Sequence, residues 1–334
     1  MKQTTLGRHK LKVPMIGLGC MGMTEFVDND IYGKVNEEEA IAIIHRSREL
    51  GCNFIDTSDL YGPWENERLV SKAIRGDRDK YIIATKFGYE IADQGQLTWQ
   101  INGKKDYVKK AVESSLKNLN TDYIDLYYLN RLDPKTPIEE TIGAMVKLVR
   151  EGKIGYIGLS EVSVEIIKRA QKIHPIAAVQ SEYSLFERTV EQTGLLDTLK
   201  SLGIGFIAYS PHGRGLLSGN SMIENPEDIA EGDFQKTIPR FQGRRFYKNP
   251  DQVIEIKKMA KEKGITISQL AIAWTIAKGS LPIPGTKRVE YLEQNISAAS
   301  VELSVLDMDR LESIVPLETS NISRYDSVNL QSIN

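Results

Sequence analysis

The sequence predicts an α/β fold in a single domain, a closed (β/α)8 barrel of the TIM type over residues 1–334. Short apolar segments alternate with longer segments of helical period along most of the chain. Eight such units are present, and this alternation is typical of parallel strands closed into a barrel. Neither a linker nor a shift in composition marks a domain boundary, which disfavours the alternative of a doubly wound open sheet.

The predicted elements begin with a small β-hairpin, because residues 4–6 and 11–13 flank a turn at Gly7. The eight predicted barrel strands are short and mainly apolar, and they cover residues 15–18, 53–56, 81–86, 123–129, 154–159, 177–180, 204–209 and 281–283. The predicted helices cover residues 37–50, 65–74, 106–119, 138–151, 162–173, 190–202, 251–263, 268–278 and 289–299. Residues 307–314 predict an extra C-terminal helix on the outside.

Helix starts and long connections refine this picture. Asn36 and Asp106 are expected to cap the helices that follow them, since short polar side chains accept hydrogen bonds from the first free amides. The longest connections each follow a strand, so we expect them at the end of the barrel that carries active sites: residues 19–36, 87–105 and 210–250.

The composition excludes several classes of protein. The hydrophobic fraction of 41%, the charged fraction of 26% and the net charge of −2 suit a globular chain and give no basic face for nucleic acid. No apolar run approaches the ~18 residues that span a bilayer, and no apolar segment follows Lys2 as in a secretory signal. Cys20 and Cys52 lack metal-ligand spacing and suit a reducing cytosol. We therefore expect a cytoplasmic enzyme without a metal or membrane partner; the oligomeric state stays open.

Residues 17–22 match the dinucleotide fingerprint G-x-G-x-x-G literally, as Gly17-Leu18-Gly19-Cys20-Met21-Gly22. That fingerprint must open directly into a helix, whose N-terminus faces the pyrophosphate. Here a segment without helical period follows, so we do not expect a Rossmann loop.

Polar side chains end three neighbouring predicted strands. Asp56 ends the second strand, with Tyr61 just beyond it; Lys86 ends the third, and Asn130 follows the fourth. Each residue alone is commonly a loop cap or half of an ion pair. Because neighbouring parallel strands place their carboxyl ends side by side, we expect the four side chains to converge.

Such a group has a definite chemistry. An ammonium beside a phenol favours the phenolate, so we expect Lys86 to lower the pKa of Tyr61, while Asp56 holds Lys86 charged. A tyrosine tuned in this way is a general acid that can protonate an alkoxide. Hydride addition to a carbonyl produces that alkoxide.

The second half of the chain offers a cradle for a hydride donor. Strand 204–209 leads into Tyr209 and a glycine-rich loop that contains Arg214, a pattern suited to stacking a flat ring and enclosing a diphosphate. Strand 281–283 leads to Lys287 and Arg288 just before a helix, where a phosphate can bind. A solvated helix start with two cations is the equally simple alternative.

Six segments, in order, resemble signatures of the aldo-keto reductase superfamily, and the resemblance covers nearly the whole chain. They are Phe54-Ile55-Asp56-Thr57-Ser58-Asp59-Leu60-Tyr61-Gly62, Ala84-Thr85-Lys86-Phe87-Gly88, Gly158-Leu159-Ser160, Gln180-Ser181-Glu182-Tyr183-Ser184, Ala208-Tyr209-Ser210-Pro211 and Ile283-Pro284-Gly285-Thr286-Lys287-Arg288. The chain most resembles the bacterial and plant branch near pyridoxal reductases and perakine reductase, with potassium-channel β subunits more distant.

The resemblance implies a barrel that binds NADP(H) and reduces a small aldehyde or ketone. By motif position, Tyr61 would donate the proton and Lys86 and Asp56 would tune it. The residues implied to bind the cofactor are Ser160 and Gln180 at the carboxamide, Tyr209 on the ring, Ser210, Pro211, His212, Gly213 and Arg214 at the pyrophosphate, Gly285, Thr286, Lys287, Arg288, Gln294 and Asn295 at the adenosine and its 2′-phosphate, and Gly22 and Met23 in a further loop.

One catalytic position departs from the family pattern, because Asn130 stands where the family usually has histidine. Asparagine can donate an N–H but cannot titrate. Two interpretations follow, a reductase slowed by Asn130 and an NADPH-binding sensor or regulatory subunit without turnover. We do not expect His212 to replace the imidazole. Aromatic residues on the long loops suggest an apolar substrate pocket, with ordinary loop packing as the alternative: Phe26, Tyr32, Trp64 and residues near Phe241.

Overall fold

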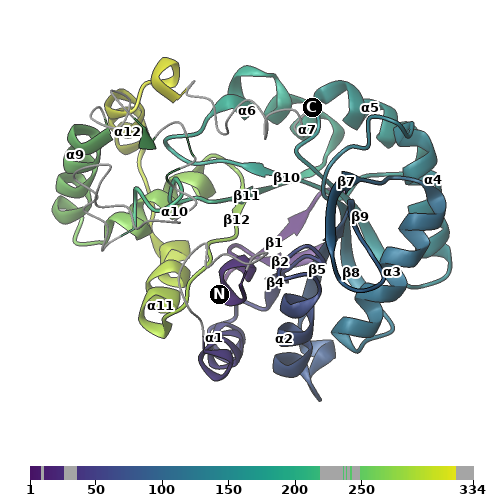
Figure 1. Ribbon diagram of the computed structural model, residues 1–334. Helices are drawn as coiled ribbons and strands as arrows, with labels where there is room; N and C mark the ends of the chain where they lie inside the picture. Colours follow the sequence, from purple (N-terminus) through teal and green to yellow (C-terminus); the bar gives the residue numbers. More distant parts are fainter. Residues whose placement is uncertain are drawn as a thin grey trace.

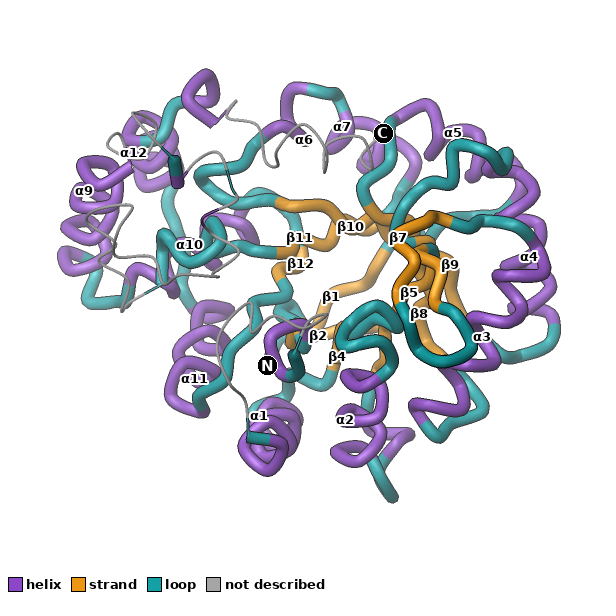
Figure 2. The backbone as a smooth tube through the Cα atoms, in the orientation of Figure 1, coloured by secondary structure: helices purple, strands orange, loops and turns teal. Residues whose placement is uncertain are grey.

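The structure is a computed structural model that describes residues 1–8, 11–25, 36–218, 236, 238, 241–242 and 249–320. Eight parallel strands form one curled sheet at the centre of the molecule, and helices surround it (Figures 1 and 2). The strands follow the order β12-β11-β10-β9-β8-β5-β4-β3, which is chain order around the sheet. The predicted (β/α)8 architecture is confirmed.

The barrel strands agree with the predicted positions to within a few residues. They are β3 (Leu18–Gly19), β4 (Phe54–Asp56), β5 (Ile82–Phe87), β8 (Ile124–Leu129), β9 (Ile154–Ser160), β10 (Ala178–Glu182), β11 (Gly205–Tyr209) and β12 (Leu281–Pro282). The helices are α1 (Glu37–Glu49), α2 (Glu65–Ile74), α3 (Lys105–Leu119), α4 (Ile138–Arg150), α5 (Val164–Ile173), α6 (Thr189–Gln192), α7 (Leu195–Leu202), α9 (Asn249–Glu262), α10 (Ile267–Ala277), α11 (Val289–Ser297) and α12 (Val305–Ile314).

The N-terminal hairpin covers one end of the barrel. Strands β1 (Gln3–Leu6) and β2 (Leu11–Pro14) pair antiparallel, as predicted. Leu6 and Val13 join the apolar cluster inside the barrel, and the backbone of Arg8 donates to Gly203 just before β11. The hairpin therefore covers the end where the strands begin, which leaves their carboxyl ends for the site.

Backbone hydrogen bonds join the two edges of the sheet. Gly17 N donates to Pro282 O at 3.0 Å, and Gly19 N donates to Pro284 O at 3.2 Å. A Cβ on Gly19 would lie 2.7 Å from Ile283 O, closer than packed atoms approach. The first two glycines of the G-x-G-x-x-G segment therefore allow the strands to meet. A short 3-10 helix (Met21–Met23) follows them, so the fingerprint lacks the α-helix that it needs.

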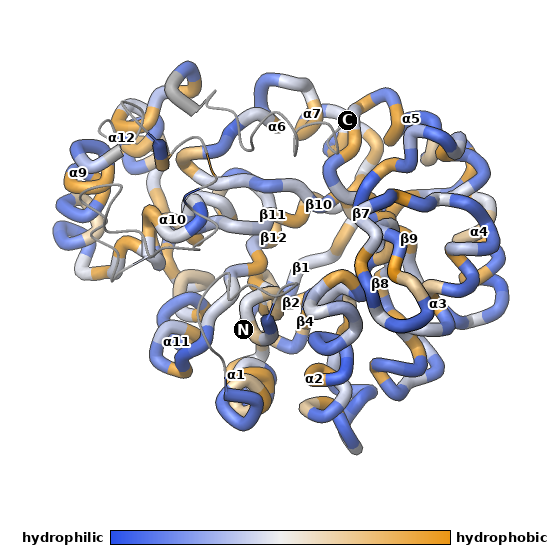
Figure 3. The backbone as a smooth tube through the Cα atoms, in the orientation of Figure 1, coloured by the Kyte–Doolittle hydropathy of each residue, from blue (hydrophilic) through white to orange (hydrophobic). Residues whose placement is uncertain are grey.

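Two apolar layers hold the fold together. One fills the barrel interior with side chains such as Phe54, Leu126 and Ile207. The other lies between the sheet and the surrounding helices, whose residues alternate between hydrophobic and hydrophilic in Figure 3, as in amphipathic helices. Within the described residues, no helix is both long and apolar enough to cross a membrane.

Three details differ from the sequence prediction. The connection 87–105 contains an antiparallel hairpin, β6 (Tyr89–Ile91) and β7 (Leu97–Ile101), where only a loop was expected. The helix predicted over 190–202 is two helices, because Gly194 adopts a left-handed φ of 71° between them. Asn36 caps α1 as predicted, but Asp106 is wrong as a cap: Lys104 is the N-cap of α3, and Asp106 lies in its first turn.

Candidate active site

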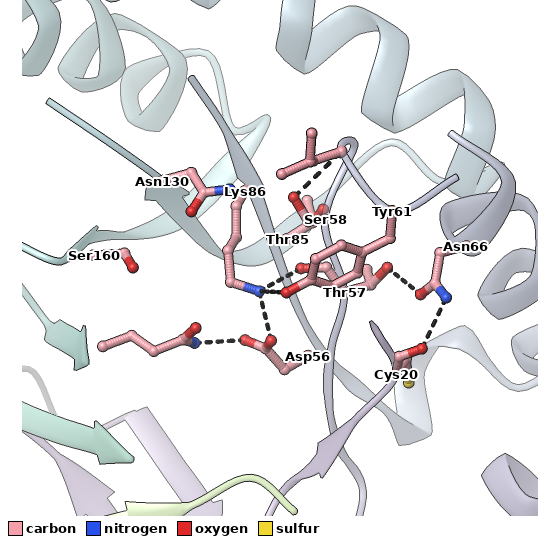
Figure 4. A network of polar contacts seen from close by, with 12 residues as sticks. Cys20, Asp56, Thr57, Ser58, Tyr61, Asn66, Thr85, Lys86, Asn130 and Ser160 are labelled. Atoms are coloured by element: carbon pink, nitrogen blue, oxygen red, sulfur yellow. Dashed lines mark hydrogen bonds and ion pairs between the residues drawn. The ribbon is translucent and has the colours of Figure 1, made fainter. Parts of the chain in front are cut away.

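Asp56, Tyr61 and Lys86 meet at the carboxyl end of the barrel (Figure 4). Lys86 Nζ lies 2.5 Å from Asp56 Oδ1, 2.8 Å from Thr57 O and 3.3 Å from the Tyr61 hydroxyl oxygen. Asp56 and Lys86 are each 2% exposed. The predicted convergence of these three side chains is therefore present, with the lysine between the acid and the phenol.

The net pKa shift of Tyr61 is opposite to the expected one. Burial raises the pKa of the Tyr61 phenol above its ordinary value, and the nearby Lys86 ammonium offsets only part of this increase. Burial acts to lower the pKa of Lys86, but Asp56 and Tyr61 outweigh it and the pKa is raised. At neutral pH the site therefore presents a protonated phenol beside a protonated lysine.

Two polar side chains on the buried face of α2 support the strand ends, and sequence reasoning missed both. Thr57, next to Asp56, donates to Asn66 Oδ1 at 2.7 Å. Thr85, next to Lys86, donates to Glu67 Oε1 at 2.7 Å. Adjacent polar residues inside an otherwise apolar helix face were the available signal, because buried polar groups are almost always hydrogen-bonded.

Asn130 lies directly after β8, is 7% exposed and donates its backbone N–H to Phe87 O at 2.7 Å. Arg131 Nη1 donates to the main-chain oxygen of Asn130 at 2.8 Å and to its Oδ1 at 3.1 Å. The same nitrogen lies 3.5 Å from Ser160 Oγ. Asn130 and Ser160 thus share a neighbour at the ends of adjacent strands.

Gln180 and Asp56 are linked across the barrel. Gln180 Nε2 donates to Asp56 Oδ2 at 2.8 Å, so the Asp56 carboxylate is held by an amide on one oxygen and by Lys86 on the other. The resemblance implied that Gln180 holds the cofactor carboxamide. In the structure its amide N–H₂ already donates to Asp56.

The loop after β11 places its implied cofactor residues at the same barrel end. Tyr209 ends the strand partly exposed, and Ser210 has a left-handed φ of 52°. The Arg214 guanidinium binds the buried Glu182 carboxylate through two hydrogen bonds of 3.0 and 2.7 Å. Burial lowers the pKa of His212 to about 4, so its imidazole is neutral. Pro211 and Gly213 are buried between these residues.

The loop after β12 presents cations at the start of α11. Arg288 is the exposed N-cap residue of that helix, and its guanidinium lies 5.6 Å from the Tyr291 ring centroid. Thr286 Oγ1 accepts from the Arg288 backbone N–H at 3.2 Å and shapes the turn. The other implied residues lie around it: Gly285 exposed, Lys287 and Gln294 partly buried, Asn295 buried. Gly22 and Met23 lie in the 3-10 helix after β3.

Of the aromatic residues suggested for a substrate pocket, the structure describes Trp64 and Phe241. Phe26 and Tyr32 lie outside the described residues. Phe241 is 1% exposed and packs in the outer core. Trp64 lines a cavity of about 420 Å³ bordered by α3 and Asp59. Among the described residues, ordinary packing therefore accounts for Phe241.

The chain matches the model of the aldo/keto reductase family over residues 16–316. It is 44% identical over 299 residues to an aldo-keto reductase of Schizosaccharomyces pombe whose name specifies NADP(+), covering 87% of this chain and 85% of that one. It is 42% identical over 323 residues to a probable aldo-keto reductase of Glycine max, covering 96% and 90%.

Solved structures agree with these matches. A glycerol dehydrogenase of Gluconobacter oxydans superposes with a TM-score of 0.84 at 25% identity, covering 93% of this chain and 94% of that one. An aldo-keto reductase of Bacillus halodurans superposes with a TM-score of 0.77 at 28% identity, covering 98% and 99%. The resemblance drawn from the six motifs is confirmed, and the protein is an oxidoreductase of the aldo/keto reductase family.

Proposed function

We propose that this protein reduces an aldehyde or ketone to an alcohol with NADPH and that Tyr61 supplies the proton. The observation that carries the proposal is the buried Asp56–Lys86–Tyr61 group at the carboxyl end of the barrel. The cofactor NADP(H) follows from membership of the family and agrees with the name of the Schizosaccharomyces pombe relative. NADPH, when bound, supplies the hydride.

The geometry supports a division of work among the three side chains. Tyr61, protonated because burial raises its pKa, gives its hydroxyl proton to the carbonyl oxygen as negative charge develops there. Lys86, 3.3 Å away, stabilises the phenolate that remains. Asp56 and the Thr57 carbonyl fix the ammonium in position through their own hydrogen bonds.

Residues from Ser160 onward support NADPH as the cofactor. Ser160 and Tyr209 lie at strand ends near the catalytic group, where they would contact the nicotinamide. The N-terminus of α11 and the exposed Arg288 provide a helix terminus and a cation for the 2′-phosphate. Arg214 is paired with Glu182, so in our proposal it shapes the diphosphate loop and adds no net charge to it.

Substitution of Tyr61 by phenylalanine tests the proposal directly. Tyr61→Phe removes the hydroxyl and leaves the ring, so we expect NADPH oxidation with an accepted aldehyde to fall at least about 100-fold. NADPH binding, followed by fluorescence titration, should change little. Turnover equal to that of the unsubstituted protein would exclude Tyr61 as the proton donor.

A second candidate is an NADPH-binding sensor or regulatory subunit with little or no turnover. It is motivated by Asn130, which cannot exchange a proton where the family usually has histidine. Comparison of the protein with its Asn130→His variant across a panel of aldehydes separates the two functions. Tight NADPH binding by both proteins, with no oxidation by either, would favour the regulatory function.

The cytoplasmic location also stays a proposal. Cys20 and Cys52 are both buried and form no disulfide. Thiols that persist in this state suit a reducing compartment, where disulfides are rare. Fractionation of the producing cells, followed by immunoblotting, should find the protein in the cytosol, and its recovery among exported proteins would contradict this location.

A further inference from the structure

In the Asn130 side-chain amide, the oxygen accepts a hydrogen bond and the nitrogen is available to donate one. Arg131 Nη1 approaches its Oδ1 at 3.1 Å, while Asn130 Nδ2 makes no hydrogen bond within the described part of the chain. In Figure 4 the oxygen points to the side of Ser160, and the nitrogen points to the side of the Lys86 side chain, beyond which Tyr61 lies. The N–H₂ group therefore points to the side of the site on which Lys86 and Tyr61 lie.

Arg131 determines this orientation chemically. A guanidinium carries five N–H donors and no acceptor, so the amide atom that faces it must be the oxygen. The same Nη1 also donates to the main-chain oxygen of Asn130 at 2.8 Å, so the guanidinium holds the backbone and the side chain of one residue together. If the Asn130 amide were flipped, its N–H₂ group would meet an N–H of Arg131, and the hydrogen bond between the two side chains would be lost. The amide oxygen of Asn130, which can only accept, would then point to the side of Tyr61.

A carbonyl substrate needs this orientation. The oxygen that takes the proton of Tyr61 becomes negatively charged, and a second donor that is already aimed at it stabilises the transition state more than the ground state. Asn130 Nδ2 is such a donor and does not have to titrate. The arrangement therefore offers a substitute for one part of the role of the absent imidazole, the donation of an N–H to the carbonyl oxygen.

We propose that Arg131 is a positioning residue that locks the Asn130 amide with its N–H₂ toward the substrate carbonyl, so that the two residues act as one unit. This inference rests on the proposed carbonyl reduction. Arg131 could instead act directly on Tyr61, because its guanidinium also acts to lower the pKa of that phenol. It could also act through Ser160, whose Oγ lies 3.5 Å from Arg131 Nη1.

A double-mutant cycle on kcat separates these routes. Asn130→Ala and Arg131→Met should each lower kcat by about 10-fold to 100-fold with little change in KM or in NADPH affinity. The double variant should be no slower than Asn130→Ala alone, because Arg131 acts only through Asn130. Multiplicative losses would overturn the proposal, as would a Met variant whose loss lies in NADPH binding or in a shifted pH profile.

Two further variants guard against a purely structural effect. Arg131→Lys keeps one donor near Oδ1 and should recover part of the activity lost in Arg131→Met. Arg169→Met makes the same change on α5, where Arg169 forms a half-exposed ion pair with Glu139 of α4, and should leave kcat unchanged. If Arg131→Lys were as slow as Arg131→Met while both remained folded by circular dichroism, donation to Oδ1 would be excluded.

A measurement on the cofactor-free protein does not depend on turnover. With asparagine side chains labelled with ¹⁵N, the Asn130 N–H₂ signal is assigned by its loss in Asn130→Asp. We expect that signal to move in Arg131→Met and to stay in place in Arg169→Met. An unmoved signal would refute the lock. A moved signal in a protein that reduces no carbonyl would instead reject the proposed function and leave the Arg131–Asn130 contact established.

Discussion

The family resemblance assigns Arg214 and Gln180 to the cofactor, but in the structure each side chain bonds to another residue of the protein. Arg214 pairs with the buried Glu182, and Gln180 donates to Asp56. Opposite charges in such a buried pair largely cancel at a distance. Positive charge for a bound dinucleotide must therefore come from residues nearer the surface, such as Arg288 at the start of α11.

Substitution of Arg288 tests the preference for NADPH over NADH at a single residue. We expect Arg288→Ala to weaken NADPH by roughly 1–3 kcal/mol, because a charge-assisted hydrogen bond to the 2′-phosphate is lost. NADH has no such phosphate, so its affinity should stay nearly constant. Fluorescence titration of both cofactors gives the comparison, and equal weakening of the two would refute the 2′-phosphate role.

The protonation of Tyr61 shows what sequence reasoning at a single residue cannot reach. The neighbours Lys86 and Asp56 were predictable, because they end adjacent strands. The depth at which the phenol is buried depends on the whole barrel end, and that depth decides the direction of the pKa shift. The three-residue group was therefore predicted correctly, while the pKa expected for Tyr61 was wrong.

At the level of elements, strongly amphipathic helices were the most predictable. The α2 boundaries, 65 and 74, agree with the prediction because its apolar period is strong. The β6–β7 hairpin was missed, although β7 alternates between apolar and polar residues along Leu97–Ile101, which is the period of a strand and was the available sign of it. The break at Gly194 was missed as well, although an isolated glycine inside a helical pattern was the available sign of it.

Backbone hydrogen bonds join the β3 and β12 edges of the sheet, and we call this contact the seam. It allows a prediction about the closure of the barrel. In Gly19→Ala the new Cβ would meet Ile283 O at 2.7 Å, and backbone cannot move aside without breaking the seam. We expect a loss of about 1–3 kcal/mol in the free energy of unfolding, measured by urea denaturation. Gly143→Ala on α4 is the matched control, because its Cβ meets nothing within 4 Å. It should be neutral or slightly stabilising.

Equal losses in the two alanine variants would mean that the strand contact at Gly19 is not a tight one. A larger loss for Gly19→Ala would establish that the G-x-G segment is a structural feature of barrel closure. Glycine would then be required in this segment because Ile283 lies too close for a Cβ, and a bound pyrophosphate would not be needed to explain it. The same data therefore test both the seam and the rejection of a Rossmann loop.

For the whole molecule, we expect the free energy of unfolding to change with pH because two acids are enclosed where α2 packs against the barrel. Asp59 and Glu67 are 2% and 0% exposed. Burial raises the pKa of Glu67 from 4.5 to about 7, and burial together with Glu67 raises the pKa of Asp59. Between pH 4.5 and 7 the folded chain therefore holds a proton that the unfolded chain has released, so the free energy of unfolding falls as pH rises through this window.

Glu67→Gln should remove much of that fall. The glutamine Oε1 can still accept the Thr85 hydroxyl, which donates to Glu67 at 2.7 Å, and the side chain no longer ionises. We expect the variant to be more stable than the unsubstituted protein at pH 8, by up to about 3 kcal/mol, and nearly equal to it at pH 5. Guanidinium denaturation at both pH values measures the difference. Glu165→Gln, an exposed site on α5, controls for the change of charge. If Glu67→Gln lost as much stability between pH 5 and pH 8 as the unsubstituted protein, the buried carboxyl would not be the group that titrates.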